Sequence, residues 1–222
     1  MSTFRFAIMG AGNIAHQFCD AVTLVEDCEV SAIASKDLGR AQKFAEECSV
    51  AHAYDNYEQM LIEEKPDCVY IAVTPNDHFR LTMLCLEHRV PVLCEKAMFT
   101  NSAEAKAVFE KAEKDQTFVM EAMWSRFLPA VNQAKKWAAE GKIGRLEALQ
   151  GRIGFLAPEG ADNRYHSPLL CGGAATDITV YAYEIATWLV NEPVRKTYAA
   201  ANLDQTGVDL TDQVTVKFEH VL

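Results

Sequence analysis

Three small residues near the amino terminus have the spacing of a nucleotide-binding turn, because Gly10, Gly12 and Ala15 form the pattern G-x-G-x-x-A. In such a turn the first glycine permits a tight bend and the second lets the backbone approach a pyrophosphate, while the alanine keeps the following helix close to the preceding strand. The helix start adds free N–H groups and a partial positive charge. The spacing therefore predicts a dinucleotide site contacted by Gly10, Gly12, Asn13 and Ile14.

The end of the second predicted strand bears on which dinucleotide binds. Ser35, Lys36 and Arg40 offer hydrogen-bond donors and positive charge there, and such groups suit the 2′-phosphate of NADP. A carboxylate at this place would instead accept the ribose 2′-hydroxyl of NAD. Because Asp37 is adjacent, NAD stays open, but the sequence favours NADP.

Two more polar segments follow predicted strands. One runs from Thr74 to His78, and the other is the pair Glu95 and Lys96. Since the carboxyl ends of parallel strands line the ligand crevice, we expect these segments to meet the cofactor and the substrate. Lys96 would bind a substrate hydroxyl and stabilise negative charge on its oxygen. The spacing also fits two alternatives. The segment from Thr74 would then be an ordinary helix-capping turn, and Lys96 a surface lysine paired with its neighbouring glutamate. The expected cofactor contacts are Thr74, Pro75, Asn76, His78 and Glu95.

A last constellation lies on one predicted helix in the second half of the chain. Asp177 and Tyr181 are four residues apart and therefore share a helix face. Gly172 and Gly173 precede them, and we expect these glycines to permit close approach of a ligand. A half-buried packing tyrosine is the alternative at position 181.

The elements that would position these residues alternate between strands and helices in the first half. This alternation implies right-handed crossovers and a parallel sheet covered on both faces, which is the doubly wound dinucleotide-binding plan. The predicted strands span residues 4–9, 30–34, 51–54, 68–73, 90–94 and 117–120. The better defined helices between and after them span residues 57–64, 78–88 and 101–114.

The pattern changes after about residue 122, so we expect a dinucleotide-binding domain over residues 1–121 and an α+β domain over 122–222. The second domain is predicted to contain helices at 129–140 and 174–190 and strands at 146–153, 195–200 and 214–218. A loop rich in Gly, Pro and Asn spans residues 157–172, and the segment 154–172 is expected to form part of the substrate wall. The candidate substrate contacts are Arg126, Arg164 and Tyr165. A sheet that stops at Leu222 would leave an open edge, so we expect the natural protein to be longer.

The bulk properties exclude several classes of function. The 222-residue chain has a formal net charge of -10, which gives no basic footprint for nucleic acid or an anionic membrane. Its seven cysteines are odd in number, lack C-x-x-C spacing and lie mostly in apolar runs, so we interpret them as buried thiols with no metal. No signal peptide or bilayer-spanning run is evident, which favours a cytoplasmic protein.

Together these motifs resemble the glucose–fructose oxidoreductase/inositol dehydrogenase family, written Gfo/Idh/MocA. The likeness rests on the glycine turn, the T-P-N segment from Thr74, the E-K pair and the G-G-x-x-x-D-x-x-x-[HY] helix, in family order over essentially the whole chain. The run over residues 120–127, MEAMWSRF, resembles the dimeric dihydrodiol dehydrogenase and sugar dehydrogenase branch. The resemblance implies a second domain built on a mostly antiparallel sheet that often forms the dimer interface.

The resemblance also implies residue roles. Lys96 matches the lysine that contacts the reacting hydroxyl, Asp177 the aspartate that orients substrate, and Tyr181 the catalytic histidine-or-tyrosine position. A lysine ammonium near the phenol would bring its pKa closer to working pH. Ala97 stands where the family usually has proline, so we expect a less constrained backbone at Lys96.

Three hypotheses follow. The first is an NADP-dependent dehydrogenase or reductase acting on a sugar, polyol or trans-dihydrodiol. The second is a non-catalytic dinucleotide-binding or sensor protein on the same fold, since fold does not determine function. The third is an inactive fragment of the enzyme.

Overall fold

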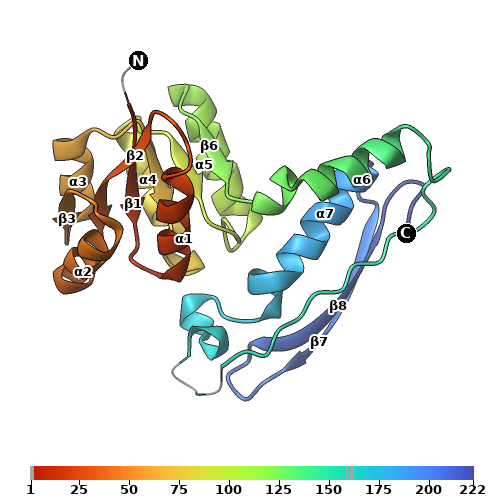
Figure 1. The fold of residues 1–222 in the computed structure, drawn as a ribbon. Coiled ribbons are helices and arrows are strands. Elements are labelled where there is room, and N and C mark those ends of the chain that lie inside the picture. The colour runs from red at the N-terminus through yellow and green to blue at the C-terminus, as the bar shows by residue number, and fades with distance from the viewer. Residues whose placement is uncertain (1–2, 159, 161–162) are drawn as a thin grey trace. The chain divides into compact units, whose positions relative to one another are not determined.

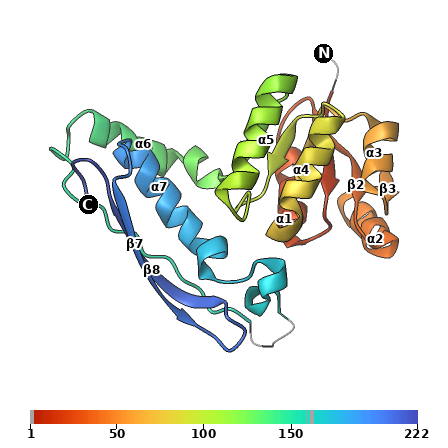
Figure 2. The same cartoon turned by 180° about the vertical axis from the view of Figure 1, so that it is seen from behind.

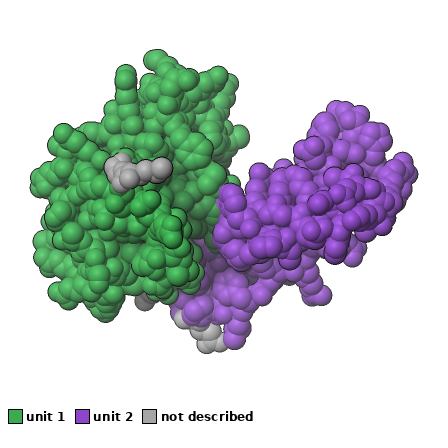
Figure 3. All heavy atoms as spheres, turned by 45° about the horizontal axis from the view of Figure 1, so that its top comes forward, with its two compact units in different colours: residues 1–122 green, residues 123–222 purple. Residues whose placement is uncertain are grey.

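The computed structural model describes residues 3–158, 160 and 163–222. The chain forms two compact units, Met1–Ala122 and Met123–Leu222, coloured green and purple in Figure 3. Residues 1 and 2, part of the stretch searched for a signal peptide, lie outside the described residues. So do positions 159, 161 and 162 of the loop 157–172.

Unit 1 is built on a six-stranded parallel sheet with the order β3-β2-β1-β4-β5-β6 (Figure 1). The order reverses between β1 and β4, and ligands of doubly wound sheets bind outside the carboxyl ends of the strands at such a switch point. The predicted parallel sheet is confirmed. Its strands are β1 Phe4–Met9, β2 Cys28–Ala34, β3 His52–Tyr54, β4 Cys68–Ile71, β5 Val92–Cys94 and β6 Val119–Glu121.

Helices cover both faces of this sheet (Figure 2). Successive strand residues point to opposite faces: Ala7 and Met9 of β1 pack in the core shared with α3 and α4, whereas Ile8 packs with α1 and α2. Burial on both faces explains the near-continuous apolar runs of these strands. The helices are α1 Asn13–Val22, α2 Leu38–Cys48, α3 Tyr57–Glu64, α4 His78–Glu87, preceded by the short turn η1 Pro75–Asp77, and α5 Ser102–Asp115.

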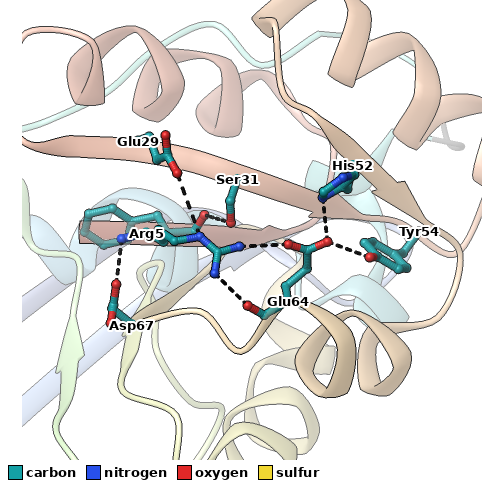
Figure 4. Close-up of polar contacts among 8 residues, drawn as sticks. Arg5, Glu29, Ser31, His52, Tyr54, Glu64 and Asp67 are labelled. Atoms are coloured by element: carbon teal, nitrogen blue, oxygen red, sulfur yellow. Dashed lines mark hydrogen bonds and ion pairs between the residues drawn. The ribbon is translucent and has the colours of Figure 1, made fainter. Parts of the chain in front are cut away.

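A buried carboxylate ties the start of β1 to β3 and α3 (Figure 4). Arg5 donates through Nη2 to Glu64 Oε2 over 2.9 Å and through Nη1 to the Glu64 carbonyl over 2.9 Å. Tyr54 donates its hydroxyl to Glu64 Oε1 over 2.6 Å, and His52 Nδ1 lies 2.6 Å from the same oxygen. We call Arg5, His52, Tyr54 and Glu64 the Glu64 cluster. Its cation and donors offset the cost of burying the Glu64 charge.

Unit 2 combines helices with an antiparallel hairpin, as the α+β prediction requires. In the hairpin Lys196 pairs with Lys217 at one end and Leu203 with Asp209 at the other. None of the described helices in either unit is long and apolar enough to cross a membrane. The elements are η2 Trp124–Phe127, α6 Pro129–Ala139, η3 Arg164–His166, η4 Pro168–Leu170, a π-helical turn Ala175–Thr179, α7 Val180–Val190, β7 Lys196–Leu203 and β8 Asp209–Lys217.

Two predictions for unit 2 were wrong in detail. The segment 146–153 is not a strand. It runs beside the β7–β8 hairpin in Figures 1 and 2, and backbone hydrogen bonds join Leu149 N and the Glu147 carbonyl to Leu222. No ladder in the described chain includes 146–153, so its apolar alternation is not matched by strand pairing there. The predicted helix 174–190 opens with a π turn, so the four-residue spacing rule of an α-helix does not hold at Asp177.

Candidate functional site

The turn between β1 and α1 requires glycine at its first position. Gly10 has φ +110°, and a Cβ there would lie 2.6 Å from the Ala72 carbonyl oxygen and 2.9 Å from Val73 Cγ1. The Gly10 N–H donates to the Ala34 carbonyl over 2.8 Å. The turn is therefore held tightly between the ends of β2 and β4, and any side chain at position 10 would displace it.

Gly12 serves a different purpose, because it caps α1 without a side chain. A Cβ at Gly12 would find only the Ala72 oxygen, 3.9 Å away, so the space in front of the helix is open. Asn13 and Ile14 are exposed beside it. By contrast α2, α3 and α5 begin with a side-chain cap, from Asp37, Asn56 and Asn101 respectively.

The start of α1 thus fits a dinucleotide. The first N–H groups of a helix need acceptors, and its positive end attracts anions. An open, glycine-capped helix start at the switch point of a parallel sheet has both features in the place where a pyrophosphate binds.

The residues after β2 divide between structure and surface. Ser35 is buried, and its Oγ accepts from Asp37 N over 3.4 Å, which argues against the predicted contact with cofactor. Asp37 caps α2 by accepting from Arg40 N over 2.8 Å, so its carboxylate is engaged at the helix start. Lys36 and Arg40 are exposed. Arg40 Nη2 reaches the Ala11 carbonyl, 3.4 Å away, in the glycine turn.

Lys36 also touches the segment after β4. Its ammonium pairs with the Asp77 carboxylate. Burial opposes ionisation of Asp77, but the hydrogen bond and charge of Lys36, with help from Arg80, hold the pKa of Asp77 below its ordinary value. Thr74 is half-buried and accepts through its carbonyl from Asp77 N over 3.0 Å, while Asn76 is exposed. Lys36 therefore links the ends of β2 and β4.

His78 turns its side chain toward backbone. The side chain is fully buried, with Nδ1 3.0 Å from the Ala97 carbonyl and Nε2 3.0 Å from the Val73 carbonyl. Burial lowers the pKa of the ring despite these bonds. Both nitrogens face backbone, so the His78 side chain joins the loops that follow β4 and β5, and its contact with the cofactor stays a prediction.

Glu95 likewise turns inward. It is 8% exposed, accepts from the Tyr70 hydroxyl over 2.5 Å and accepts from Lys96 N over 3.3 Å. Burial outweighs the attraction of the Lys96 ammonium and raises the pKa of Glu95. These bonds show that the Glu95 carboxylate supports the loop that carries Lys96, and its contact with the cofactor stays a prediction. Lys96 is half-buried, and its peptide bond to Ala97 is cis.

In unit 2 the structure brings three of the predicted residues together. Arg164 Nη2 donates to Asp177 Oδ1 over 3.2 Å. The Arg164 guanidinium also lies 4.0 Å from the centre of the Tyr165 ring. Asp177 is on the π turn, so its carboxylate meets the loop that contains two candidate substrate contacts.

Gly172 and Gly173 make room for the chain itself. A Cβ at Gly172 would lie 2.5 Å from the Arg164 carbonyl oxygen, and one at Gly173 would collide with the Asp209 carboxylate. Asp209 Oδ2 also accepts from Ala175 N over 2.6 Å at the start of the π turn. The prediction that these glycines admit a ligand is corrected: they admit neighbouring parts of unit 2.

Tyr181 lies in the first turn of α7 and accepts a hydrogen bond from Trp124 Nε1 over 2.9 Å. Their rings are 6.0 Å apart at an interplanar angle of 70°. Arg126, predicted to contact substrate, pairs through Nε with Glu184, which is 8% exposed. This bond gives Arg126 a structural partner on α7.

The family follows from matches to both units. The model described as "Oxidoreductase family, NAD-binding Rossmann fold" matches residues 4–123. The model described as "GFO/IDH/MocA C-terminal domain" matches residues 131–221. The chain belongs to the Gfo/Idh/MocA oxidoreductase family. The resemblance carried by the sequence motifs is confirmed.

Curated relatives of this Gfo/Idh/MocA chain include trans-1,2-dihydrobenzene-1,2-diol dehydrogenases. The mouse protein is 31% identical over 220 residues, 96% of this chain and 65% of the relative. The human protein is 30% identical over 222 residues, 97% of this chain and 64% of the relative. The chain thus spans slightly less than two thirds of the length of these relatives.

Solved structures show the same fold. A 3-ketoreductase from Actinomadura kijaniata in complex with NADP has a TM-score of 0.90 at 22% identity, over 98% of this chain and 67% of its own. An oxidoreductase from Agrobacterium radiobacter in complex with NAD+ has a TM-score of 0.83 at 20% identity, over 99% of this chain and 64% of its own. These two structures contain different dinucleotides.

Sequence reasoning missed Trp124 and Ser125 as partners of α7. Both lie within the MEAMWSRF run that carried the likeness to the dihydrodiol dehydrogenase branch. Ser125 Oγ donates to Glu184 Oε2 over 3.2 Å. The usable signal was Glu184 itself, a lone carboxylate on an otherwise apolar helix, since a buried charge requires partners.

Proposed function

We propose that the full-length Gfo/Idh/MocA protein is an NADP-dependent dehydrogenase or reductase acting on a CH–OH group of a sugar, polyol or trans-dihydrodiol. The observation that carries the proposal is the glycine-capped, open start of α1 at the switch point of the sheet. The relatives that are trans-dihydrobenzenediol dehydrogenases support the substrate class.

The cofactor would be held by the turn after β1 and by the ends of β2 and β4. Gly10 and Gly12 would hold the pyrophosphate against the N–H groups of Asn13 and Ile14. Thr74, Pro75 and Asn76 would contact the cofactor from the segment after β4. When bound, the nicotinamide supplies the acceptor or donor of hydride, which is chemistry that the side chains lack.

Preference for NADP is proposed from charge. Lys36 and Arg40 are exposed cations at the end of β2, and Asp37 is used as the cap of α2. A 2′-phosphate would find two cations there, whereas a ribose hydroxyl would find an Asp37 carboxylate with one oxygen already used by the α2 cap.

Three side chains are assigned to substrate by their family positions. Lys96 would donate to the reacting hydroxyl and stabilise negative charge on its oxygen. Tyr181 would accept the hydroxyl proton during oxidation and return it during reduction. Asp177, held by Arg164, would orient the substrate, and Arg164 and Tyr165 would form part of the substrate wall.

The test uses the full-length protein. Isothermal calorimetry with NADP and NAD measures binding, and nicotinamide absorbance then follows a panel of sugars, polyols and trans-dihydrodiols. We expect tighter binding of NADP and turnover of at least one compound. Binding without turnover of any of them would favour the non-catalytic sensor. No binding of either dinucleotide would contradict the proposal at its base.

The family resemblance further implies a homodimer of the full-length protein. All eight residues of β7 are exposed in unit 2, which leaves a sheet face for contact with another chain. Light scattering of the full-length protein would test this, and a monomer at micromolar concentration would contradict it.

A further inference from the structure

Three consecutive residues of η2 bind one face of α7. Trp124 Nε1 donates to the Tyr181 hydroxyl oxygen over 2.9 Å. Ser125 donates to Glu184 Oε2 over 3.2 Å, and Arg126 donates through Nε to Glu184 Oε1. Tyr181 and Glu184 are three residues apart on the helix, so they are surface neighbours. The turn therefore follows the helix with one side chain on Tyr181 and two on Glu184.

The Glu184 contacts fix the position of this turn. Ser125 is 4% and Glu184 8% exposed, and a buried carboxylate bound by a guanidinium makes strong, directional hydrogen bonds. One turn further along α7, the Arg126 guanidinium lies 5.7 Å and Lys135 Nζ 4.0 Å from the centre of the Trp188 ring. The backbone of η2 is thus anchored to α7 independently of Trp124.

Trp124 itself does not serve as a core residue. Its side chain is 55% exposed, and its edge contact with Tyr181 leaves most of the indole outside the packed interior. The energy of burial therefore does not account for a tryptophan here. The specific feature of the residue is the N–H directed at the phenolic oxygen.

An indole N–H is a donor only and never accepts. The Tyr181 oxygen therefore accepts from Trp124 whether or not the phenol carries its proton. A protonated phenol must then direct its own O–H at a different acceptor. When the phenol loses its proton, the Trp124 bond becomes charge-assisted and favours the anion more than it favoured the neutral group.

We propose that Trp124 is a positioning residue for proton transfer at Tyr181, because its indole N–H aims the phenolic proton at the substrate oxygen and stabilises the phenolate. This inference rests on the proposed proton role of Tyr181. It gives Trp124 a role that is exerted through Tyr181, and it explains why η2 is held against α7.

The test compares Trp124→Phe with Trp137→Phe in the full-length protein. Both variants remove an indole N–H and keep an aromatic ring, but Trp137 lies on α6 and is 47% exposed. The pH dependence of kcat for substrate oxidation is measured for each. We expect Trp124→Phe to move the midpoint upward by about half to one pH unit, with kcat approaching the wild-type value at high pH. The Trp137→Phe midpoint should match the wild type.

A second readout needs no turnover. The ultraviolet absorbance of phenolate is titrated in wild-type protein and in Tyr181→Phe, and the difference isolates Tyr181. Repeating the pair in the Trp124→Phe background should show the same upward movement. Thermal melting of each variant confirms that the comparison is made between folded proteins.

The outcomes separate the two proposals. If Tyr181→Phe retains full turnover, the proposed proton role fails and this inference fails with it. If Tyr181→Phe is inactive but Trp124→Phe keeps the wild-type midpoint in both readouts, only this inference is overturned. A rise in KM with an unchanged midpoint also overturns it, because Trp124 would then act only through contact with substrate.

Discussion

Two regions of unit 1 each contain a buried carboxylate, but they use it in opposite ways. Glu64 is 7% exposed and Glu95 8%. Glu64 is bound by the Arg5 guanidinium, and two further side chains, His52 and Tyr54, reach the same carboxylate. Glu95 accepts from a tyrosine hydroxyl and a backbone N–H, and burial raises its pKa.

The difference shows that one part of the sheet stabilises the fold, whereas another part positions the residues proposed to bind ligand. The Glu64 cluster is neutralised by its own cation and joins β1, β3 and α3, so its value is stability. Around Glu95 the cation Lys96 is the residue proposed to bind substrate, and the acid is held next to it by donors that also fix the backbone. Changes in the first region should therefore alter unfolding, and changes at the carboxyl ends of the strands should alter binding.

Replacing Arg5 by methionine should give the largest loss of stability. The Glu64 carboxylate would remain buried without its guanidinium, and breaking such a pair costs about 3 kcal/mol. Urea unfolding at neutral pH measures this loss, and calorimetry should find NADP affinity unchanged in the folded variant.

The matched control is Arg145→Met, since the pair of Arg145 with Glu147 is 75% and 66% exposed. We expect a loss below about 1 kcal/mol there. Equal losses in the two variants, or weaker NADP binding by Arg5→Met, would remove the distinction between the regions.

Gly12→Ala should weaken cofactor binding without unfolding the protein. The added methyl would lie 3.9 Å from the nearest atom, at the open start of α1, so stability is retained while NADP affinity falls about tenfold, or about 1.4 kcal/mol. Gly10→Ala is the contrasting variant, because its Cβ would collide with the Ala72 carbonyl and lower the melting temperature. Wild-type NADP affinity in Gly12→Ala would show that the glycine turn at the start of α1 does not hold the pyrophosphate.

Lys36→Ala should change the choice of cofactor several-fold. Removing an exposed cation from a 2′-phosphate costs about 1 kcal/mol, so NADP should bind more weakly and NAD equally well. Lys43→Ala, on α2 in an exposed pair with Glu47, is the control and should change neither. An equal loss for both cofactors would mean that Lys36 acts through its Asp77 pair and not through the phosphate.

Glu95→Gln should produce the smallest effect, a change in how stability depends on pH. The folded pKa of Glu95 lies above its ordinary value of 4.5, so the folded state holds the proton more tightly than the unfolded state. The contribution of Glu95 is therefore fully present below pH 4.5 and is lost as pH rises through the folded pKa. The glutamine variant should lack this decline, as measured by urea unfolding at a series of pH values. Parallel curves for the two proteins would contradict the assignment.

Much of unit 1 was predictable because its strands are buried on both faces. Ala7, Ile8 and Met9 pack against helices on different faces of the sheet. Burial on both faces requires consecutive apolar residues, and such a run can be recognised in the sequence alone. The segment 146–153 has a similar apolar alternation but no ladder partner in the described chain. Whether a partner exists depends on the rest of the sheet, which a local pattern does not contain.

For the candidate site, the sequence predicted where residues lie along the chain but not the direction of their side chains. The rule that strand ends line the crevice located His78 and Glu95 correctly along the chain, but their side chains turn into the protein toward backbone carbonyls and Tyr70. Gly172 shows the same limit, since its missing side chain makes room for the Arg164 carbonyl. Side-chain direction depends on which neighbours remain unsatisfied, and those neighbours are distant in sequence.

The proposed chemistry is tested most directly by comparing wild-type protein with Tyr181→Phe, both full length and saturated with NADP, in oxidation of the best substrate found. We expect equal NADP affinity and a loss of at least about a hundredfold in kcat for the variant, which is the scale of a positioned proton-transfer group. Full turnover by Tyr181→Phe would contradict the proton role of Tyr181, because the proton would then leave the substrate by another route.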